Sequence, residues 1–244
     1  MASETVYRFT RNKVAVGAAI LLGSIAMVAI LGPFIAPYDP LEQDLINNYA
    51  SPSFDHLLGT DDLGRDTLSR LIYGARISLG ISLSSVGLGV LMGSLLGLLA
   101  AFYGGWLDRA VMRFMDFLLA LPGILLAIAI VAVLGKGIFN TIIAVAIFSV
   151  PTFARLARAS ALSIIELDYI EATKALGASD RRILSKHIVP NALTPLVVQA
   201  TLSLGTAILI SSGLSFLGLG VQPPHPEWGA MLSKGRELIR TTPV

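Results

Sequence analysis

Long apolar stretches alternate with short polar segments along this chain. Five stretches contain no Asp, Glu, Lys or Arg and are rich in Leu, Ile, Val and Ala: 14–38, 77–107, 117–135, 137–154 and 188–226. A helix needs about 20 apolar residues to cross roughly 30 Å of hydrocarbon. The pattern therefore predicts an all-α membrane protein, a polytopic helical bundle with five visible spans.

The composition supports this class and excludes others. Only 14% of residues are charged and the mean hydropathy is +0.74, whereas roughly a quarter of the residues in soluble proteins carry charge. The net charge of +2 gives no support for binding nucleic acid. The absence of cysteine from the sequence excludes disulfides and thiolate metal sites.

The first stretch follows Arg8, Arg11 and Lys13, an arrangement that a secretory signal peptide also shows. Its apolar run is long for a signal peptide and no clear small-residue cleavage site follows it, so an uncleaved first transmembrane helix at 14–36 is the preferred interpretation. The third and fourth stretches are separated only by Gly-Lys-Gly at 135–137. This separation predicts a tight turn between two antiparallel spans.

Basic residues indicate the direction of insertion. With the N-terminus in the cytoplasm, the inside segments 1–13, 104–113 and 155–190 hold eleven of the 18 Lys and Arg residues, which favours that orientation. The resulting layout has a cytoplasmic tail (1–13), an extracytoplasmic loop (37–76), a transmembrane core (77–220) and an extracytoplasmic segment (221–244). Five spans would leave the C-terminus outside, so we expect a sixth span that is absent from this chain.

Two features concern the interior of the bundle. Gly89, Gly93 and Gly97 lie on one face of the second span and predict close packing of another helix, with a sliding surface as the alternative. No span interior contains a clear ionisable residue, which weakens the case for an ion-coupled carrier. Four charged residues instead cluster at the cytoplasmic start of the third span: Asp108, Arg109, Arg113 and Asp116.

The polar segment 155–190 has the pattern of two short helices. Apolar residues recur at helical spacing up to Leu176, Gly177 supplies a stop, and Ser179 can cap a second helix that runs through His187. Pro190 with the following asparagine should end that helix and begin the fifth span. The pattern fits an elbow that docks on a cytoplasmic partner, or one that rests on lipid headgroups.

The same segment carries a motif. It consists of Glu171-Ala172-Thr173, three further residues, Gly177, and then an Ile-Val-Pro that ends at Pro190. This arrangement resembles the EAA loop of binding-protein-dependent ABC importer permeases. Thr173 replaces the second alanine of that pattern, and His187 replaces its isoleucine. The resemblance implies that loop 159–190 couples to an ATPase through Glu171, Ala172, Thr173, Gly177, Ala178 and Pro190.

Three further blocks resemble one branch of that family, the second permease subunit of dipeptide, oligopeptide and nickel importers. They are the segment 56–79, the Leu-Pro-Gly at 121–123 and the segment 215–232. Members of this branch continue into a last span, in line with the expected sixth span. The resemblance implies a multi-pass protein of a bacterial or archaeal cytoplasmic membrane.

The resemblance also implies partners. These are two ABC ATPase subunits, a second homologous permease subunit, an extracytoplasmic solute-binding protein and membrane lipid. The sequence contains no Walker A pattern, so we expect no catalysis, no directly bound cofactor or metal, and ATP consumption by partner subunits. The solute class implied is di- or oligopeptides, with nickel chelates or glutathione as alternatives, and nothing in the chain identifies the substrate-binding residues.

Other interpretations remain open at this point. A secondary carrier would move solute without ATP, and a membrane-embedded enzyme would need a nucleophile with a base, yet Ser215 lacks the Gly-x-Ser-x-Gly setting. The acidic residues Asp61, Asp62 and Asp66 do not have calcium-loop spacing, so helix capping and solvated surface are the expected roles. Trp106 and Trp228 are expected as interfacial anchors.

Overall fold

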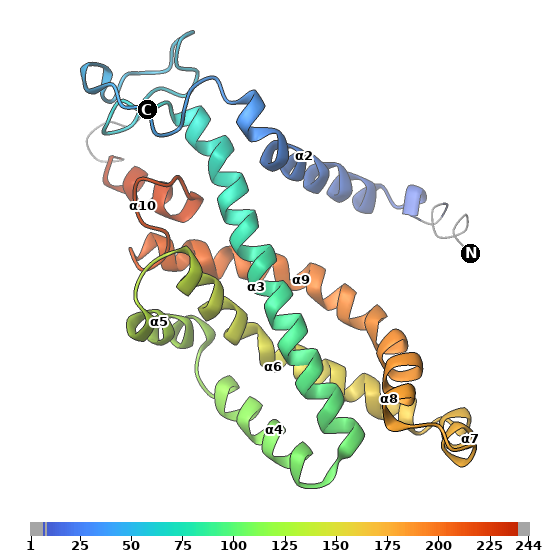
Figure 1. Ribbon diagram of the computed structural model, residues 1–244. Helices are drawn as coiled ribbons and strands as arrows, with labels where there is room; N and C mark the ends of the chain where they lie inside the picture. The colour runs from blue at the N-terminus through green and yellow to red at the C-terminus, as the bar shows by residue number, and fades with distance from the viewer. Residues whose placement is uncertain (1–6, 8, 239–244) are drawn as a thin grey trace. The chain divides into compact units, whose positions relative to one another are not determined.

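The computed structural model describes Tyr7 and residues 9–238, and all regular elements in this range are helices. Figure 1 traces them in chain order. The elements are α2 (Lys13–Ile35), η1 (Leu45–Asn47), α3 (Thr67–Tyr103), α4 (Gly105–Leu119), α5 (Gly123–Leu134), α6 (Ile138–Ile165), α7 (Asp168–Ala175), α8 (Asp180–Ile183), η2 (Leu184–Ile188), α9 (Val189–Phe216) and α10 (Trp228–Leu238). The predicted cytoplasmic tail and the end of the predicted segment 221–244 fall largely outside the described residues.

Four helices are long and apolar enough to cross a membrane: α2, α3, α6, and the continuous helix Asp180–Phe216 that contains α9. A fifth span is present if the bent pair α4 and α5 counts as one. The all-α polytopic class is thereby confirmed. Helix α2 begins and ends within one residue of the helix expected at 14–36. Its N-cap Asn12 lies just before the apolar run and accepts from the amides of Val14 and Ala15.

The apolar stretch 117–135, expected to be one span, is divided between two helices. Helix α4 ends at Leu119, α5 begins at Gly123, and their axes differ by 94°. Pro122 lacks an amide hydrogen and disfavours helical geometry in the residue before it, which explains the break. Twelve residues of α5 span only about 18 Å as a helix, less than the hydrocarbon thickness.

The structure divides into two compact units, one formed by the described residues up to Leu79 and from Pro223, the other by Gly80–Gln222. In the second unit, α6 contacts α4, α5, α7, η2 and α9. Its inward side is almost continuously buried, with Phe153, Ala157 and Ala161 fully enclosed. Small residues on α6 bring its neighbours close, so this helix forms the centre of the unit.

The glycines on α3 pack against α6, as their spacing predicts. A Cβ atom on Gly89 would lie 2.8 Å from the Ser149 Cβ, and one on Gly93 would lie 2.6 Å from the carbonyl oxygen of Val150. A Cβ on Gly97 would overlap the carbonyl oxygen of Ala154. The two backbones therefore approach closely because these positions have no side chain.

In the first unit, acidic side chains cap and brace the segment before α3. Asp66 accepts from the Ser69 amide at 2.7 Å, which confirms helix capping as its role. Arg65 is buried and binds Asp61 at 2.7 Å. Burial acts to raise the pKa of Asp61, but hydrogen bonds from the Arg65 side chain and from backbone amides outweigh it, so this pKa lies below its ordinary value.

Trp228 at the start of α10 packs within the same unit. Its indole nitrogen donates to the Leu71 carbonyl at 3.1 Å, and a Cβ on Gly74 would lie 2.9 Å from its ring. The neighbouring Glu227 is fully buried, and its carboxylate accepts from the Ser78 hydroxyl at 3.1 Å and from the Ala230 amide at 2.9 Å. The tryptophan is therefore a packing residue of α3 and α10, a role that its position near a span end did not reveal.

Candidate functional site: the segment between α6 and α9

The segment that carries the predicted motif is an elbow of short helices. Helix α6 extends to Ile165, eleven residues past the end of its predicted span, and α7 follows after Glu166 and Leu167. The predicted first helix is thus two helices. Figure 1 shows α7 beyond the end of α6, away from the turn that joins α5 and α6.

The second half of the elbow differs from the prediction. Pro190 and the asparagine after it do not end a helix, because Asp180–Phe216 is continuous and passes through the π-helical turn η2 at Leu184–Ile188. Pro190 is the second residue of α9 and follows directly on this π-helical turn, where the regular α-helical hydrogen-bond pattern is already interrupted. Ser179 occupies the predicted N-cap position of α8, but its side chain makes no capping hydrogen bond.

Gly177 makes the bend that the motif predicts. Its φ is +80°, its amide donates to the Lys174 carbonyl at 2.9 Å, and the Ala178 amide donates to the Thr173 carbonyl at 3.2 Å. These two bonds form a Schellman motif, in which glycine is favoured because an L side chain is strained at positive φ. Gly177 therefore fixes the direction in which the chain leaves α7.

Three isoleucines anchor the elbow. Ile170 of α7, Ile183 of α8 and Ile188 of η2 are all fully buried and belong to the same hydrophobic cluster as residues of α6 and α9. Protein interiors are packed as densely as organic crystals and transmit displacement rather than absorbing it. A force on the elbow would consequently reach both long helices.

The opposite face of the elbow is exposed. Glu171 and Ala172 are exposed, and the Leu176 side chain is 89% exposed. None of the charged residues from Glu166 to Lys186 forms an ion pair with any described residue. Lys174 lies over the Phe102 ring, 5.8 Å from its centroid. This face otherwise combines exposed apolar and charged side chains, a composition suited to a protein surface.

The structure brings the two halves of the motif together. The rings of Tyr169 in α7 and His187 in η2 lie 5.9 Å apart, so the Glu-Ala-Thr half and the half that ends at Pro190 are neighbours. Thr173 is half-buried and donates to the Tyr169 carbonyl at 2.6 Å. Its hydroxyl is satisfied inside α7, which explains how the helix accommodates threonine at the position of the motif's second alanine.

Two ion pairs between α4 and α6 were not predicted. Arg158 binds both carboxylate oxygens of Asp108, at 2.5 and 2.6 Å, and Arg155 binds Asp116 at 2.6 Å. The clustering of charge on α4 was visible in the sequence. The partners on α6 were not, since they lie 39 and 50 residues further along the chain.

Comparisons with known proteins establish the class. The family described as binding-protein-dependent transport system inner membrane component matches residues 93–239, and the N-terminal transmembrane domain of oligopeptide transport permease C matches residues 1–52. The chain belongs to this family of inner membrane components. It is therefore a multi-pass permease subunit of a binding-protein-dependent ABC importer, in which ATP hydrolysis resides on separate subunits.

Curated relatives agree along most of the chain. A dipeptide transport system permease from Alkalihalophilus pseudofirmus is 45% identical over 98% of this chain and 79% of its own length. A di/tripeptide permease from Pseudomonas aeruginosa is 49% identical over 95% of this chain and 78% of its own. A glutathione permease from Escherichia coli O157:H7 is 51% identical over 94% of this chain and 76% of its own.

Solved structures agree on the fold. The inward-facing MetNI methionine ABC transporter aligns with a TM-score of 0.58 and 23% identity, covering 72% of this chain and 82% of that one. At this identity the likeness concerns the fold alone. It shows that the helix arrangement of an ABC importer permease is compatible with this sequence.

Proposed function

We propose that this chain forms one half of the translocation pathway of an ATP-driven importer of di- and oligopeptides. The proposal of a peptide substrate rests on the relatives named for dipeptide, di/tripeptide and glutathione transport. Glutathione is itself a tripeptide, so these names describe one chemical class. The complete complex comprises this chain, a second homologous permease, two ATPase subunits and an extracytoplasmic binding protein.

The coupling segment between α6 and α9 is the proposed contact with an ATPase subunit. The observation that carries this proposal is the contrast between its two faces: three fully buried isoleucines on one side, and the exposed Glu171, Ala172 and Leu176 on the other. When the ATPase pair closes on ATP, the exposed face is displaced. The buried face then carries the displacement into α6 and α9. The distribution of Lys and Arg along the chain supports an N-terminus in the cytoplasm.

Substrate class is tested by reconstituting the complex with its binding protein in proteoliposomes. Uptake of labelled dipeptide, tripeptide, glutathione and a nickel chelate is measured with ATP and with a non-hydrolysable analogue inside. ATP-dependent uptake of the peptides is the expected result. Uptake that is independent of ATP would contradict the importer mechanism, and uptake of the nickel chelate alone would contradict the peptide assignment.

The coupling assignment is tested by Gly177→Val. Valine is disfavoured at φ of +80° by a kcal/mol or more, so the bend after α7 should distort. We expect the assembled complex to lose uptake while it retains ATP hydrolysis. The measurement is the ratio of solute transported to ATP hydrolysed.

Gly218→Val is a matched control. Gly218 has a φ of +74°, lies in open space, and makes the same pair of Schellman hydrogen bonds at the end of α9. Valine at this position carries the same backbone strain as valine at Gly177, but after the C-terminal end of α9 and outside the coupling segment. If both variants lower the transport ratio equally, the effect is general strain and the coupling assignment fails.

A further inference from the structure

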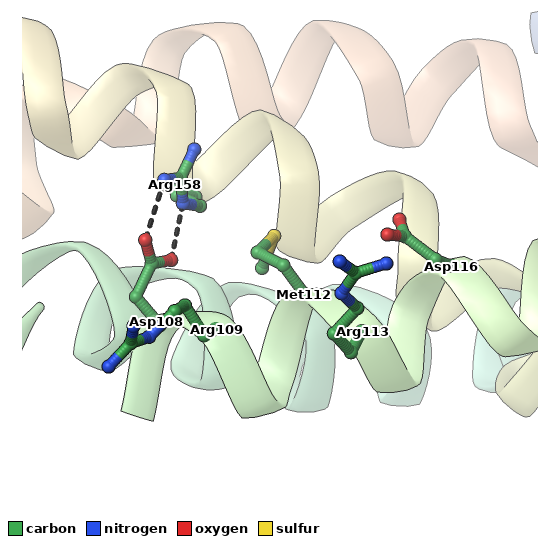
Figure 2. Close-up of a pocket in the computed structure, with 6 residues that line it drawn as sticks. All are labelled: Asp108, Arg109, Met112, Arg113, Asp116 and Arg158. Atoms are coloured by element: carbon green, nitrogen blue, oxygen red, sulfur yellow. Dashed lines mark hydrogen bonds and ion pairs between the residues drawn. The ribbon is translucent and has the colours of Figure 1, made fainter. Parts of the chain in front are cut away.

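An open pocket of about 320 Å³ lies between α4 and α6, within one compact unit. It is lined by Asp108, Arg109, Met112, Arg113, Asp116 and Arg158, as Figure 2 shows. Its volume is several times the roughly 30 Å³ that one water molecule occupies in the liquid. The pocket therefore has room for a polar group of several heavy atoms.

The charges around this pocket are unbalanced. Both carboxylates bind arginines of α6, since Asp108 binds Arg158 and Asp116 binds Arg155. Arg109 and Arg113 have no hydrogen bond or ion pair with any residue in the described part of the chain. They are one helical turn apart on α4. Their guanidinium groups point in different directions in Figure 2, so binding one anion requires these long, flexible side chains to turn toward each other.

The exposed surface of α4 has the composition of a helix at a membrane interface. Trp106, Phe114 and Phe117 are 69%, 56% and 64% exposed, on the same helix as the two unpaired arginines. The pocket residue Arg158 is seven residues from the end of α6 at Ile165, or about 10 Å along the axis. The distribution of basic residues puts segment 104–113 on the cytoplasmic side of the membrane, and aromatic and basic side chains are favoured where a helix meets the lipid headgroups.

We propose that Arg109 and Arg113 bind the phosphate of an anionic phospholipid in this pocket, while the exposed aromatic side chains of α4 contact its acyl chains. The planar guanidinium groups suit phosphate oxygens, which accept paired hydrogen bonds from arginine. The phosphate supplies the negative charge that balances Arg109 and Arg113. The two aspartates do not supply it, because each already pairs with an arginine of α6. The site is distinct from the coupling segment and does not depend on which solute is carried.

The experiment uses the purified importer complex in a neutral detergent. It is titrated with short-chain phosphatidylglycerol, with phosphatidylcholine of the same chain length, and with inorganic phosphate, and bound lipid is counted by native mass spectrometry. We expect wild-type complex to prefer phosphatidylglycerol. Each arginine contributes about a factor of five near an anionic surface, so Arg109→Gln/Arg113→Gln should weaken that binding about thirtyfold.

Two further variants separate a site from general electrostatics. Arg76→Gln/Lys136→Gln removes the same total charge from other exposed positions and should retain phosphatidylglycerol. Arg109→Lys/Arg113→Lys keeps the charge in place but loses the planar fork of N–H donors, so it should weaken binding by less than Arg109→Gln/Arg113→Gln and by more than the Arg76→Gln/Lys136→Gln control. Equal binding of the two lipids by wild type would overturn the proposal, even if a variant failed to assemble. An equal loss of phosphatidylglycerol binding in the Arg76→Gln/Lys136→Gln control would also overturn it. Displacement of bound lipid by inorganic phosphate at the same concentration as the lipid would overturn it as well, because it would indicate a site for free anions.

Discussion

Helices α3 and α4 pack against α6 in different ways. Helix α3 approaches through Gly89, Gly93 and Gly97, which leave no space for a methyl group between the backbones. Helix α4 also packs a buried side chain, Met115, against Val150 and Ala154 of α6, but beside it α4 makes the Asp108–Arg158 and Asp116–Arg155 pairs and leaves an open pocket. The α3 contact leaves no room for added atoms, whereas the α4 contact combines an apolar part with partly exposed ion pairs.

The difference between these two contacts indicates which helices of this unit can shift relative to α6. A glycine contact depends on dispersion between closely spaced atoms, which is lost steeply with separation. An ion pair between long side chains tolerates small displacements, because the side chains can follow one another. We therefore expect α3 and α6 to move as one body, and α4 to adjust its position relative to α6.

The largest expected effect is at Gly97. In Gly97→Ala the new methyl group would overlap the Ala154 carbonyl oxygen and lie 2.9 Å from its carbonyl carbon. These are backbone atoms that no rotamer change can move, so we expect a loss of about 3 kcal/mol or more. Unfolding of the detergent-solubilised chain by a graded denaturing detergent measures it.

Gly87→Ala is the control for this substitution. It lies on the same helix, with nothing within 4 Å of the added methyl group, and alanine is favoured over glycine in a helix by about 1 kcal/mol. It should be neutral or stabilising. Equal destabilisation by the two variants would show that α3 and α6 are not in close contact.

A smaller effect is expected at the pair of Asp108 and Arg158. Their side chains are 20% and 32% exposed, so removing one partner leaves a partly desolvated charge, and Arg158→Gln should cost about 2 kcal/mol. The double variant Asp108→Asn/Arg158→Gln should lose less than the sum of the single losses. A double-mutant cycle measures this coupling, and strict additivity would mean that the two residues do not interact.

The smallest effect is expected at Asp116 and Arg155. Both side chains are about half exposed, at 51% and 52%, and exposed ion pairs contribute at most about 1 kcal/mol. We expect Arg155→Gln to change stability little, and the residual effect to vanish when the salt concentration is raised. A loss as large as that of Arg158→Gln, persisting in high salt, would show that this pair is buried in the assembled protein.

Much of the fold could be predicted from the sequence. The apolar stretches located the long helices, because the transfer of about 20 residues into hydrocarbon depends on local composition. The spacing of Gly89, Gly93 and Gly97 predicted a close contact, and the position of Gly177 after α7 predicted a bend. Each of these features depends on residues that are close together in the chain, so the sequence was enough to predict it.

The errors share a different cause. The stretch 117–135 was expected to be one span, yet the chain bends by 94° at the segment that contains Pro122. Pro190 was expected to end a helix that in fact continues into α9. Proline weakens a helix at a fixed position, but the surrounding packing decides whether the chain turns there or continues. The sequence contained both prolines and gave no measure of the packing around them.

The sequence alone determined that this is an α-helical membrane protein with a motif-bearing elbow between two spans, since hydrophobicity, helix periodicity and glycine conformation act over a few residues. Only the tertiary structure decided that Ile170, Ile183 and Ile188 share one buried cluster, that Asp108 and Asp116 find arginines on α6, and that Arg109 and Arg113 remain unpaired within the described residues. These outcomes depend on contacts between residues far apart in the chain, whose free energies no local pattern contains.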